Sequence, residues 1–165
     1  RALGEPRLAS VGWTRRPGES DGDSKIRHKL IKALGTTGRS TEVVREARHR
    51  LTRYIDEGEH DLLDGNAVQA AVCVVAYNCR GAQDVELVRR GFLGASTPEE
   101  AERFYLSLAS FPDPQLTRDA WAWALASPRV PQNALPTVFS GMASARHHTQ
   151  WLFFFFFLWG GEGGG

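Results

Sequence analysis

The sequence is poor in the features that define several protein classes. It has only two cysteines, Cys73 and Cys79, six positions apart in a helical pattern, so they point to different faces and no bridge between them is expected. Lysine and arginine exceed aspartate and glutamate by one, which indicates no nucleic-acid partner. The apolar run at residues 151–159 is too short for the roughly 20 residues of a membrane span. With 165 residues, the chain is long enough to bury a core without metal or disulfides.

Helical periodicity is what the sequence has instead. No stretch alternates apolar and polar residues as a half-buried strand does, and the ambiguous run Val72–Val75 is assigned to a helix because its flanks are rich in alanine. The third predicted helix is apolar nearly all round, so we expect it to be the most buried. The predicted helices span roughly residues 21–35, 40–58, 63–78, 83–92, 97–109 and 113–127, with a shorter seventh at 133–143.

Local signals mark where several of these helices begin and end. Thr97-Pro98 and Asp113-Pro114 each combine a capping side chain with proline at the first helical position. Gly35 is expected to end the first helix in the left-handed conformation, and Gly58 to close the second. The apolar side of the first helix is predicted to consist of Ile26, Leu30, Ala33 and Leu34.

The spacing of the helices predicts a repeat architecture. Helix pairs start near residues 21, 63, 97 and 131, roughly 34 to 42 residues apart, which is typical of stacked two-helix repeats. We therefore predict an all-α fold, a HEAT-like α-solenoid of about four stacked antiparallel helix pairs. The predicted division is an irregular lead-in from a missing preceding domain (1–19), a helical-repeat domain (20–150) and an atypical tail, rich in phenylalanine and then glycine (151–165).

Four spaced motifs carry a family resemblance. Residues 12–20 read Gly-Trp-x-x-x-Pro-Gly-Glu-Ser, and residues 97–108 read Thr-Pro-x-Glu-x-x-Arg-Phe-x-Leu-x-Leu. Residues 111–116 read Phe-x-Asp-Pro-x-Leu, and residues 131–143 hold Pro-Gln-Asn-Ala and then Phe-x-Gly-Met-Ala. In order and spacing this series resembles the helical C-terminal domain of the zinc aminopeptidases, the family that includes puromycin-sensitive aminopeptidase and aminopeptidase N. One departure is Arg129-Val130, where the family usually has Val-Arg.

The resemblance implies a role within a larger enzyme. Members of the family remove N-terminal residues from peptides with a zinc ion that is held by a His-Glu-x-x-His helix and a later glutamate. This sequence contains neither the His-Glu-x-x-His motif nor the Gly-Glu-Asn loop of the family. His60 has no such partners, and the adjacent His147 and His148 would point about 100° apart on a helix. We therefore expect no catalytic or metal-binding residue in this chain. Zinc is expected in the missing catalytic domain, and that domain and the peptide substrate of the full enzyme are the expected partners.

Two groups of side chains allow either a functional or a structural interpretation. A cationic stripe of Arg45, Arg48, His49 and Arg53 has the spacing to hold a carboxylate, although a solvated helix face is the ordinary explanation. Trp121 and Trp123 lie two positions apart and cannot share a helix face. One of them is expected to pack in the core while the other is half-exposed, at a groove or domain interface if it has a function.

Two alternatives to the enzyme-domain hypothesis follow from the same residues. A free-standing HEAT-like adaptor would bind a protein partner on its concave face. Alternatively, the chain is a truncated fragment, since it opens without methionine and ends in an uncharged Phe-rich segment that promotes association if it is not buried. The two cysteines, expected to be unbridged, and the lack of a visible targeting segment favour a cytoplasmic location.

Overall fold

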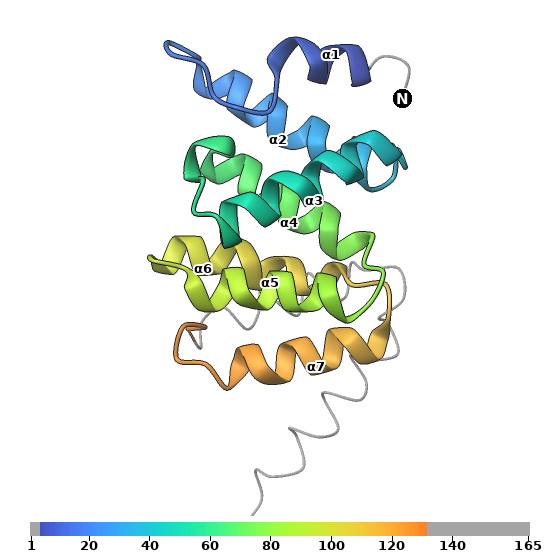
Figure 1. Cartoon of the computed structure of the whole chain (residues 1–165), viewed down its shortest axis with the longest axis vertical. Coiled ribbons are helices and arrows are strands. Elements are labelled where there is room, and N and C mark those ends of the chain that lie inside the picture. The colour runs from blue at the N-terminus through green and yellow to red at the C-terminus, as the bar shows by residue number, and fades with distance from the viewer. Residues whose placement is uncertain (1–3, 132–165) are drawn as a thin grey trace, which may run out of the picture.

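The computed structural model describes residues 4–131, and within them all regular structure is helical (Figure 1). The helices stack along one axis from α1 at one end to α7 at the other, so the predicted all-α, solenoid-like fold is confirmed. The predicted helix at 133–143 and the tail at 151–165 lie outside the described residues. The α-helices are α1 (Gly4–Val11), α2 (Asp21–Gly35), α3 (Thr41–Asp56), α4 (Gly65–Tyr77), α5 (Ala82–Gly94), α6 (Pro98–Tyr105) and α7 (Pro114–Leu125), and the 3-10 helices are η1 (His60–Leu62) and η2 (Leu106–Ser110).

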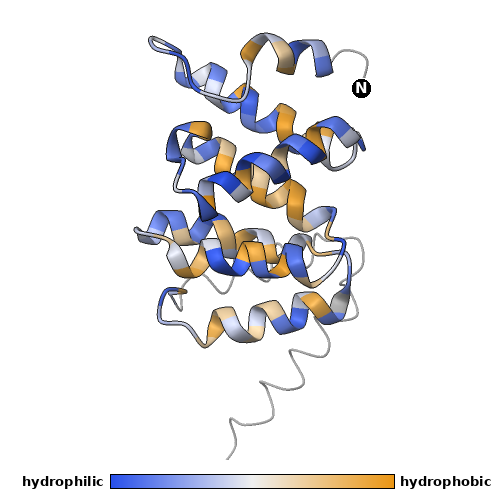
Figure 2. Ribbon diagram, in the orientation of Figure 1, coloured by the Kyte–Doolittle hydropathy of each residue, from blue (hydrophilic) through white to orange (hydrophobic). Residues whose placement is uncertain are grey.

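The helices form two rows with α4 near the centre. In one row α2 packs on α4, which packs on α6 and η2; in the other, α3 packs on α5 and α5 on α7. Hydrophobic residues are concentrated in α4, at the middle of the stack (Figure 2). Helix α4 is buried along most of its length, as predicted, and the run Val72–Val75 is helical. Its buried residues are Ala67, Val68, Ala70, Ala71, Val72, Cys73, Val74, Val75 and Ala76.

Short polar side chains begin most of these helices, as the sequence signals predicted. Asp113 accepts hydrogen bonds from two backbone N–H groups at the start of α7, and Thr97 accepts one from Glu100 at the start of α6. The carboxylate of Glu100 accepts from the backbone N–H of Ser96 (2.8 Å), one residue earlier than in a capping box. The predicted single helix at 97–109 is divided, because its last turn tightens into the 3-10 helix η2.

Helix α1 is a correction to the prediction of an irregular lead-in. Its Leu8 and Val11 are 4% and 8% exposed and belong to the hydrophobic core, and Glu5 accepts a hydrogen bond from the hydroxyl of Ser40 (2.8 Å). Pro6 lies in the first turn, where it removes no helical hydrogen bond. Eight residues are too few to show a periodic pattern, and packing on α2 stabilises the helix. The division of the chain near residue 19 stays a prediction.

The buried face of α2 also differs from the prediction. Ile26 is 37% exposed and Ala33 is exposed, whereas the residues on the buried face include a charged one. The helix is turned this way because Arg27 enters a polar cluster, described below. Its buried residues are Ser24, Arg27, Ile31, Leu34 and Gly35.

Two glycines at helix ends have different reasons to be glycine. Helix α2 ends at Gly35 as predicted, but Gly35 is not among the residues with positive φ. A Cβ atom at Gly35 would lie 2.5 Å from Cγ2 of Val74, so glycine allows α2 to approach α4 closely. Gly58, just beyond α3, closes that helix as predicted, and its φ of +70° shows that the left-handed conformation expected at Gly35 occurs at Gly58 instead.

Candidate functional site

A buried guanidinium links the Gly-Trp motif to the helical stack. Arg27 has no exposed surface; its Nη1 lies 2.9 Å from Oδ2 of Asp64 and its Nε lies 3.0 Å from the carbonyl oxygen of Gly12. Its Nη2 donates to the carbonyl of Val11 (3.3 Å) and forms an ion pair with Glu19. One side chain of α2 therefore joins the end of α1, both ends of the motif at residues 12–20 and the start of α4. We call Arg27, Glu19 and Asp64 the Arg27 cluster.

The carboxylates of the Arg27 cluster are held by further hydrogen bonds. Asp64 caps α4 through the backbone N–H of Ala67 (2.8 Å) and accepts from the hydroxyl of Ser24 (3.2 Å). The Arg27 guanidinium, through its hydrogen bond, holds the pKa of Glu19 below its usual value. Burial opposes the charge of Arg27, but its two carboxylate partners raise its pKa. The ion pair therefore favours the charged forms of Arg27 and Glu19, and the cluster holds segments of the chain in position.

The burial of Arg27 is not predicted by the sequence. Arg27 stands four residues before Ile31 and therefore on the same helix face, but arginine is ordinarily an exposed residue, so the signal is weak. Only the fold brings Asp64, 37 residues away, against it. The tryptophan of the same motif, Trp13, is half-buried, and the guanidinium of Arg50 lies 5.5 Å from its ring centre.

The predicted cationic stripe is a face on which each arginine is paired. Arg48 makes a bidentate contact with Asp84 of α5, with both N–O distances 2.9 Å. Arg53 pairs with Glu57 and Glu59, and Arg45 pairs with Glu42. His49 is exposed. A carboxylate ligand would have to displace an existing partner, so the geometry favours the structural interpretation of this stripe.

A groove of about 530 Å³ lies between α3 and α5, next to that stripe. Arg90, at the edge of the groove, makes a bidentate contact with Asp56 (3.1 and 3.0 Å). Since Arg48 is paired with Asp84, both arginines of the groove are neutralised. Paired charges of both signs offer polar contacts to an extended peptide but no activated nucleophile or free base. Its lining includes Arg48, Thr52, Gln83, Asp84, Leu87 and Arg90.

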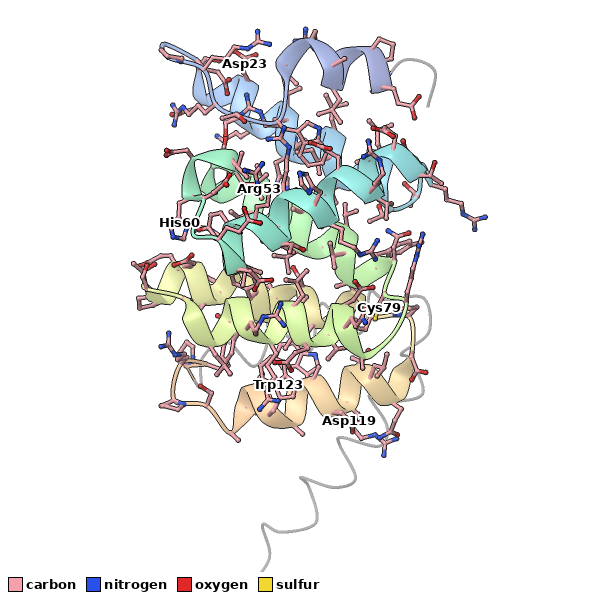
Figure 3. All side chains as sticks on the ribbon, viewed as in Figure 1. Asp23, Arg53, His60, Cys79, Asp119 and Trp123 are labelled. Carbon is pink, nitrogen blue, oxygen red and sulfur yellow. The ribbon has the colours of Figure 1, made fainter. Side chains whose placement is uncertain are left out.

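The tryptophans of α7 behave as predicted. Trp121 is 1% exposed and lies in the core, whereas Trp123 is half-buried between α7 and α5 (Figure 3). The ring centre of Trp123 is 5.4 Å from that of Phe92, and the guanidinium of Arg89 lies 5.8 Å away. Packing between helices therefore accounts for both indoles.

The remaining candidate side chains are dispersed. Cys73 is buried in α4 and Cys79 lies beyond its end, and both thiols are free. The ring of His60 lies edge-on against that of Tyr54, with ring centres 4.6 Å apart. Nδ1 of His28 forms a hydrogen bond with the carbonyl oxygen of Asn66 (2.8 Å). His147 and His148 lie outside the described residues.

The described residues do not fit a zinc site. Between residues 4 and 131, no three His, Cys, Asp or Glu side chains are grouped so that they could hold a metal ion. Zinc requires three or four such ligands, so no catalytic step through zinc can be assigned to these residues. In the same part of the chain, no helix is long and apolar enough to cross a bilayer.

Tyr54 and Glu100 form a pH-sensitive contact between α3 and α6. The hydroxyl of Tyr54 donates to Oε1 of Glu100 (2.7 Å), and burial, together with this hydrogen bond, raises the pKa of Tyr54 to about 12. Burial acts to raise the pKa of Glu100, but hydrogen bonds from Ser96 and Tyr54 outweigh it and leave that pKa below 4.5. The contribution of Glu100 to stability is therefore present above pH 4.5 and is lost as the pH falls through its lowered pKa.

Replacing Tyr54 by phenylalanine tests this contact. We expect Tyr54→Phe to lower the free energy of unfolding by about 1 kcal/mol at pH 7, because a hydrogen bond to a charged acceptor is lost. The difference from wild type should shrink at acid pH, as the pH falls through the lowered pKa of Glu100 and its carboxylate becomes protonated. Urea unfolding at both pH values measures it, with Tyr77→Phe, an exposed tyrosine, as the control. An equal difference at both pH values would contradict the assignment.

Comparison with known proteins places the chain among parts of aminopeptidases. The family model described as the ERAP1-like C-terminal domain matches residues 1–157. The chain is similar to aminopeptidase M1-A of Oryza sativa subsp. japonica, with 28% identity over 151 residues, 90% of this chain and 17% of that protein. It is also 28% identical over 127 residues to aminopeptidase M1 of Arabidopsis thaliana, covering 76% of this chain and 14% of that protein. The chain thus spans less than a fifth of either relative, and no solved structure matches it significantly.

Proposed function

The chain belongs to the ERAP1-like C-terminal domain family, and on that basis we propose that it is the regulatory, substrate-enclosing domain of a zinc metallo-aminopeptidase. In this proposal the domain has no catalytic site of its own. The catalytic domain of the same enzyme holds the zinc and removes N-terminal residues from peptides. The observation that carries the proposal is the family match over residues 1–157, together with relatives that are aminopeptidases more than five times as long as the matched segment.

The arrangement of the described residues is consistent with a structural role, in which the domain helps to enclose the substrate. The buried, apolar α4 and cross-helix ion pairs such as Arg48–Asp84 and Arg90–Asp56 hold the stack together. A helical wall can restrict which peptides reach a neighbouring catalytic site, and its closure excludes water and limits peptide length. In this proposal residues 4–131 form the wall, and no three of their His, Cys, Asp and Glu side chains are grouped as zinc ligands would be. The cytoplasmic location stays a prediction.

Reconstitution tests the proposed function. The catalytic region that the proposal places before this chain is produced alone and together with the chain, and zinc content and hydrolysis are measured. We expect zinc and aminoacyl-amide hydrolysis with the catalytic region alone. Adding this chain should change the ratio of the hydrolysis rates of a ten-residue peptide and an aminoacyl amide by at least about threefold. The reason is that the long peptide would contact the added domain, whereas a substrate of one residue would not.

Two results would overturn the proposal. One is that no catalytic region precedes this chain; the other is that the two pieces neither bind nor alter each other's activity. Either result would favour the free-standing adaptor. The chain alone serves as the control and should hydrolyse neither substrate.

A further inference from the structure

Charge is segregated along the helical stack although the whole chain is nearly neutral. Residues 4–39, which form α1, α2 and the adjoining loops, hold eight lysines and arginines against four aspartates and glutamates. Residues 40–131 hold ten against fourteen. The end of the stack that contains α1 and α2 (Figure 1) is therefore positively charged, and the remainder is negatively charged.

The excess positive charge includes a row of lysines on one face of α2. Lys25, Lys29 and Lys32 are exposed and follow one another at spacings of four and three residues, so they line up along the helix over about 10 Å. None of the three has an ion pair or hydrogen bond with another side chain within residues 4–131. We call these residues, with Ile26 beside them, the α2 lysine face.

The α2 lysine face differs from the other cationic helix of the stack. On α3, carboxylates within the chain already neutralise Arg45, Arg48 and Arg53, as expected for a solvated or intramolecular surface. On α2 none of the three lysines has a carboxylate partner among residues 4–131, and the apolar side chain of Ile26 on the same helix is 37% exposed. A row of cations with no carboxylate partner among the described residues suits an anionic surface of a partner, because complementary charge steers association and fixes the orientation of the partner.

We propose that the α2 lysine face docks an acidic helical segment of a polypeptide partner. A partner helix with carboxylates at matching spacings of four and three residues would meet all three lysines, and an apolar side chain beside them would cover Ile26. Three lysines over 10 Å are too few for nucleic acid, which typically engages six to ten phosphate contacts. Anionic membranes typically need four to eight basic residues and a broad apolar face.

Binding of a designed peptide to this chain tests the inference and does not depend on the proposed function. The probe is a fluorescent 18-residue helical peptide with glutamates at positions i, i+4 and i+7 and a leucine beside them. A second peptide has the same composition in scrambled order. We expect the patterned peptide to bind at least about fivefold more tightly than the scrambled one, because only it presents its carboxylates on one face.

Two variants with equal charge change separate the lysine face from overall charge. The triple variant Lys25→Gln, Lys29→Gln and Lys32→Gln should bind the patterned peptide about tenfold more weakly. The matched control, Arg45→Gln, Arg53→Gln and Arg89→Gln, should stay within about twofold of wild type. Circular dichroism and urea unfolding verify that both variants are folded.

Three results would overturn the proposal. The first is a lysine variant that binds the patterned peptide as tightly as wild type. The second is a matched control that loses as much affinity, which would make binding a property of net charge. In the third, phosphatidylserine vesicles or a 20-nucleotide single-stranded RNA bind through the same lysines more tightly than the peptide, which would assign the face to a lipid surface or to nucleic acid.

Discussion

Replacing Arg27 with alanine is expected to lower the free energy of unfolding by about 3 kcal/mol or more, because the carboxylates of Glu19 and Asp64 would be left without their buried partner. The carbonyl groups of Gly12 and Val11 would also lose a donor. A domain with a typical total stability of about 5 to 15 kcal/mol would lose a large fraction of it. Urea unfolding at pH 7 measures the change.

The matched control for that variant is Arg45→Ala. Arg45 and its partner Glu42 are both well exposed, with side chains 68% and 72% accessible, so Arg45→Ala should leave the free energy of unfolding close to that of wild type. Hydrogen exchange adds a local measure, since α1 depends on the Arg27 cluster and its amides should exchange faster in Arg27→Ala. If Arg27→Ala were as stable as Arg45→Ala, the cluster would have no stabilising role.

The second large effect is expected at Gly91 of α5. A Cβ atom there would lie 2.1 Å from Cε1 and 2.5 Å from Cζ of Phe104, whose side chain is fully buried in α6. The ring is fully buried, so it can make room only by displacing packed neighbours, and Gly91→Ala should lower the free energy of unfolding by about 2 kcal/mol. This loss is expected although alanine favours a helix interior over glycine by about 1 kcal/mol.

Gly94→Ala, in the same helix, is the control for Gly91→Ala. Nothing lies within 4 Å of a Cβ atom at Gly94, so this variant should be as stable as wild type or slightly more stable. The double variant Gly91→Ala, Phe104→Leu should recover part of the loss, because a smaller side chain admits the methyl group. A Gly91→Ala protein that matched Gly94→Ala in urea unfolding would refute close packing of α5 on α6.

Most of the helices could be predicted because their signals are local. A cap such as Thr97 or Asp113 satisfies backbone N–H groups two or three residues away, so it acts wherever the helix packs. Residues 67–76 are apolar except for Gln69, and this composition likewise predicts a buried position for α4. The family resemblance also came from motifs that local sequence order displays, and the match over residues 1–157 confirms it.

The short helix α1 and the interior turns of the stack could not be predicted in this way. Helix α1 is formed by eight residues with little pattern, and burial of Leu8 and Val11 on α2 stabilises it. The last turn of the predicted helix at 97–109 became η2 where it packs on α4 and α7. In both places contacts between elements decided the conformation.

The sequence by itself determined the helical class, most helix starts and the family, because caps, prolines and periodic apolar residues act within a few positions of one another. Tertiary structure alone decided which face of α2 is buried and where its charges go. Arg27 can be buried only because Asp64, 37 residues later, and Glu19 converge on it. Lys25, Lys29 and Lys32 are exposed and meet no carboxylate within the part of the chain that the structure describes. Pairing between charges distant in sequence depends on the fold, and no local pattern records it.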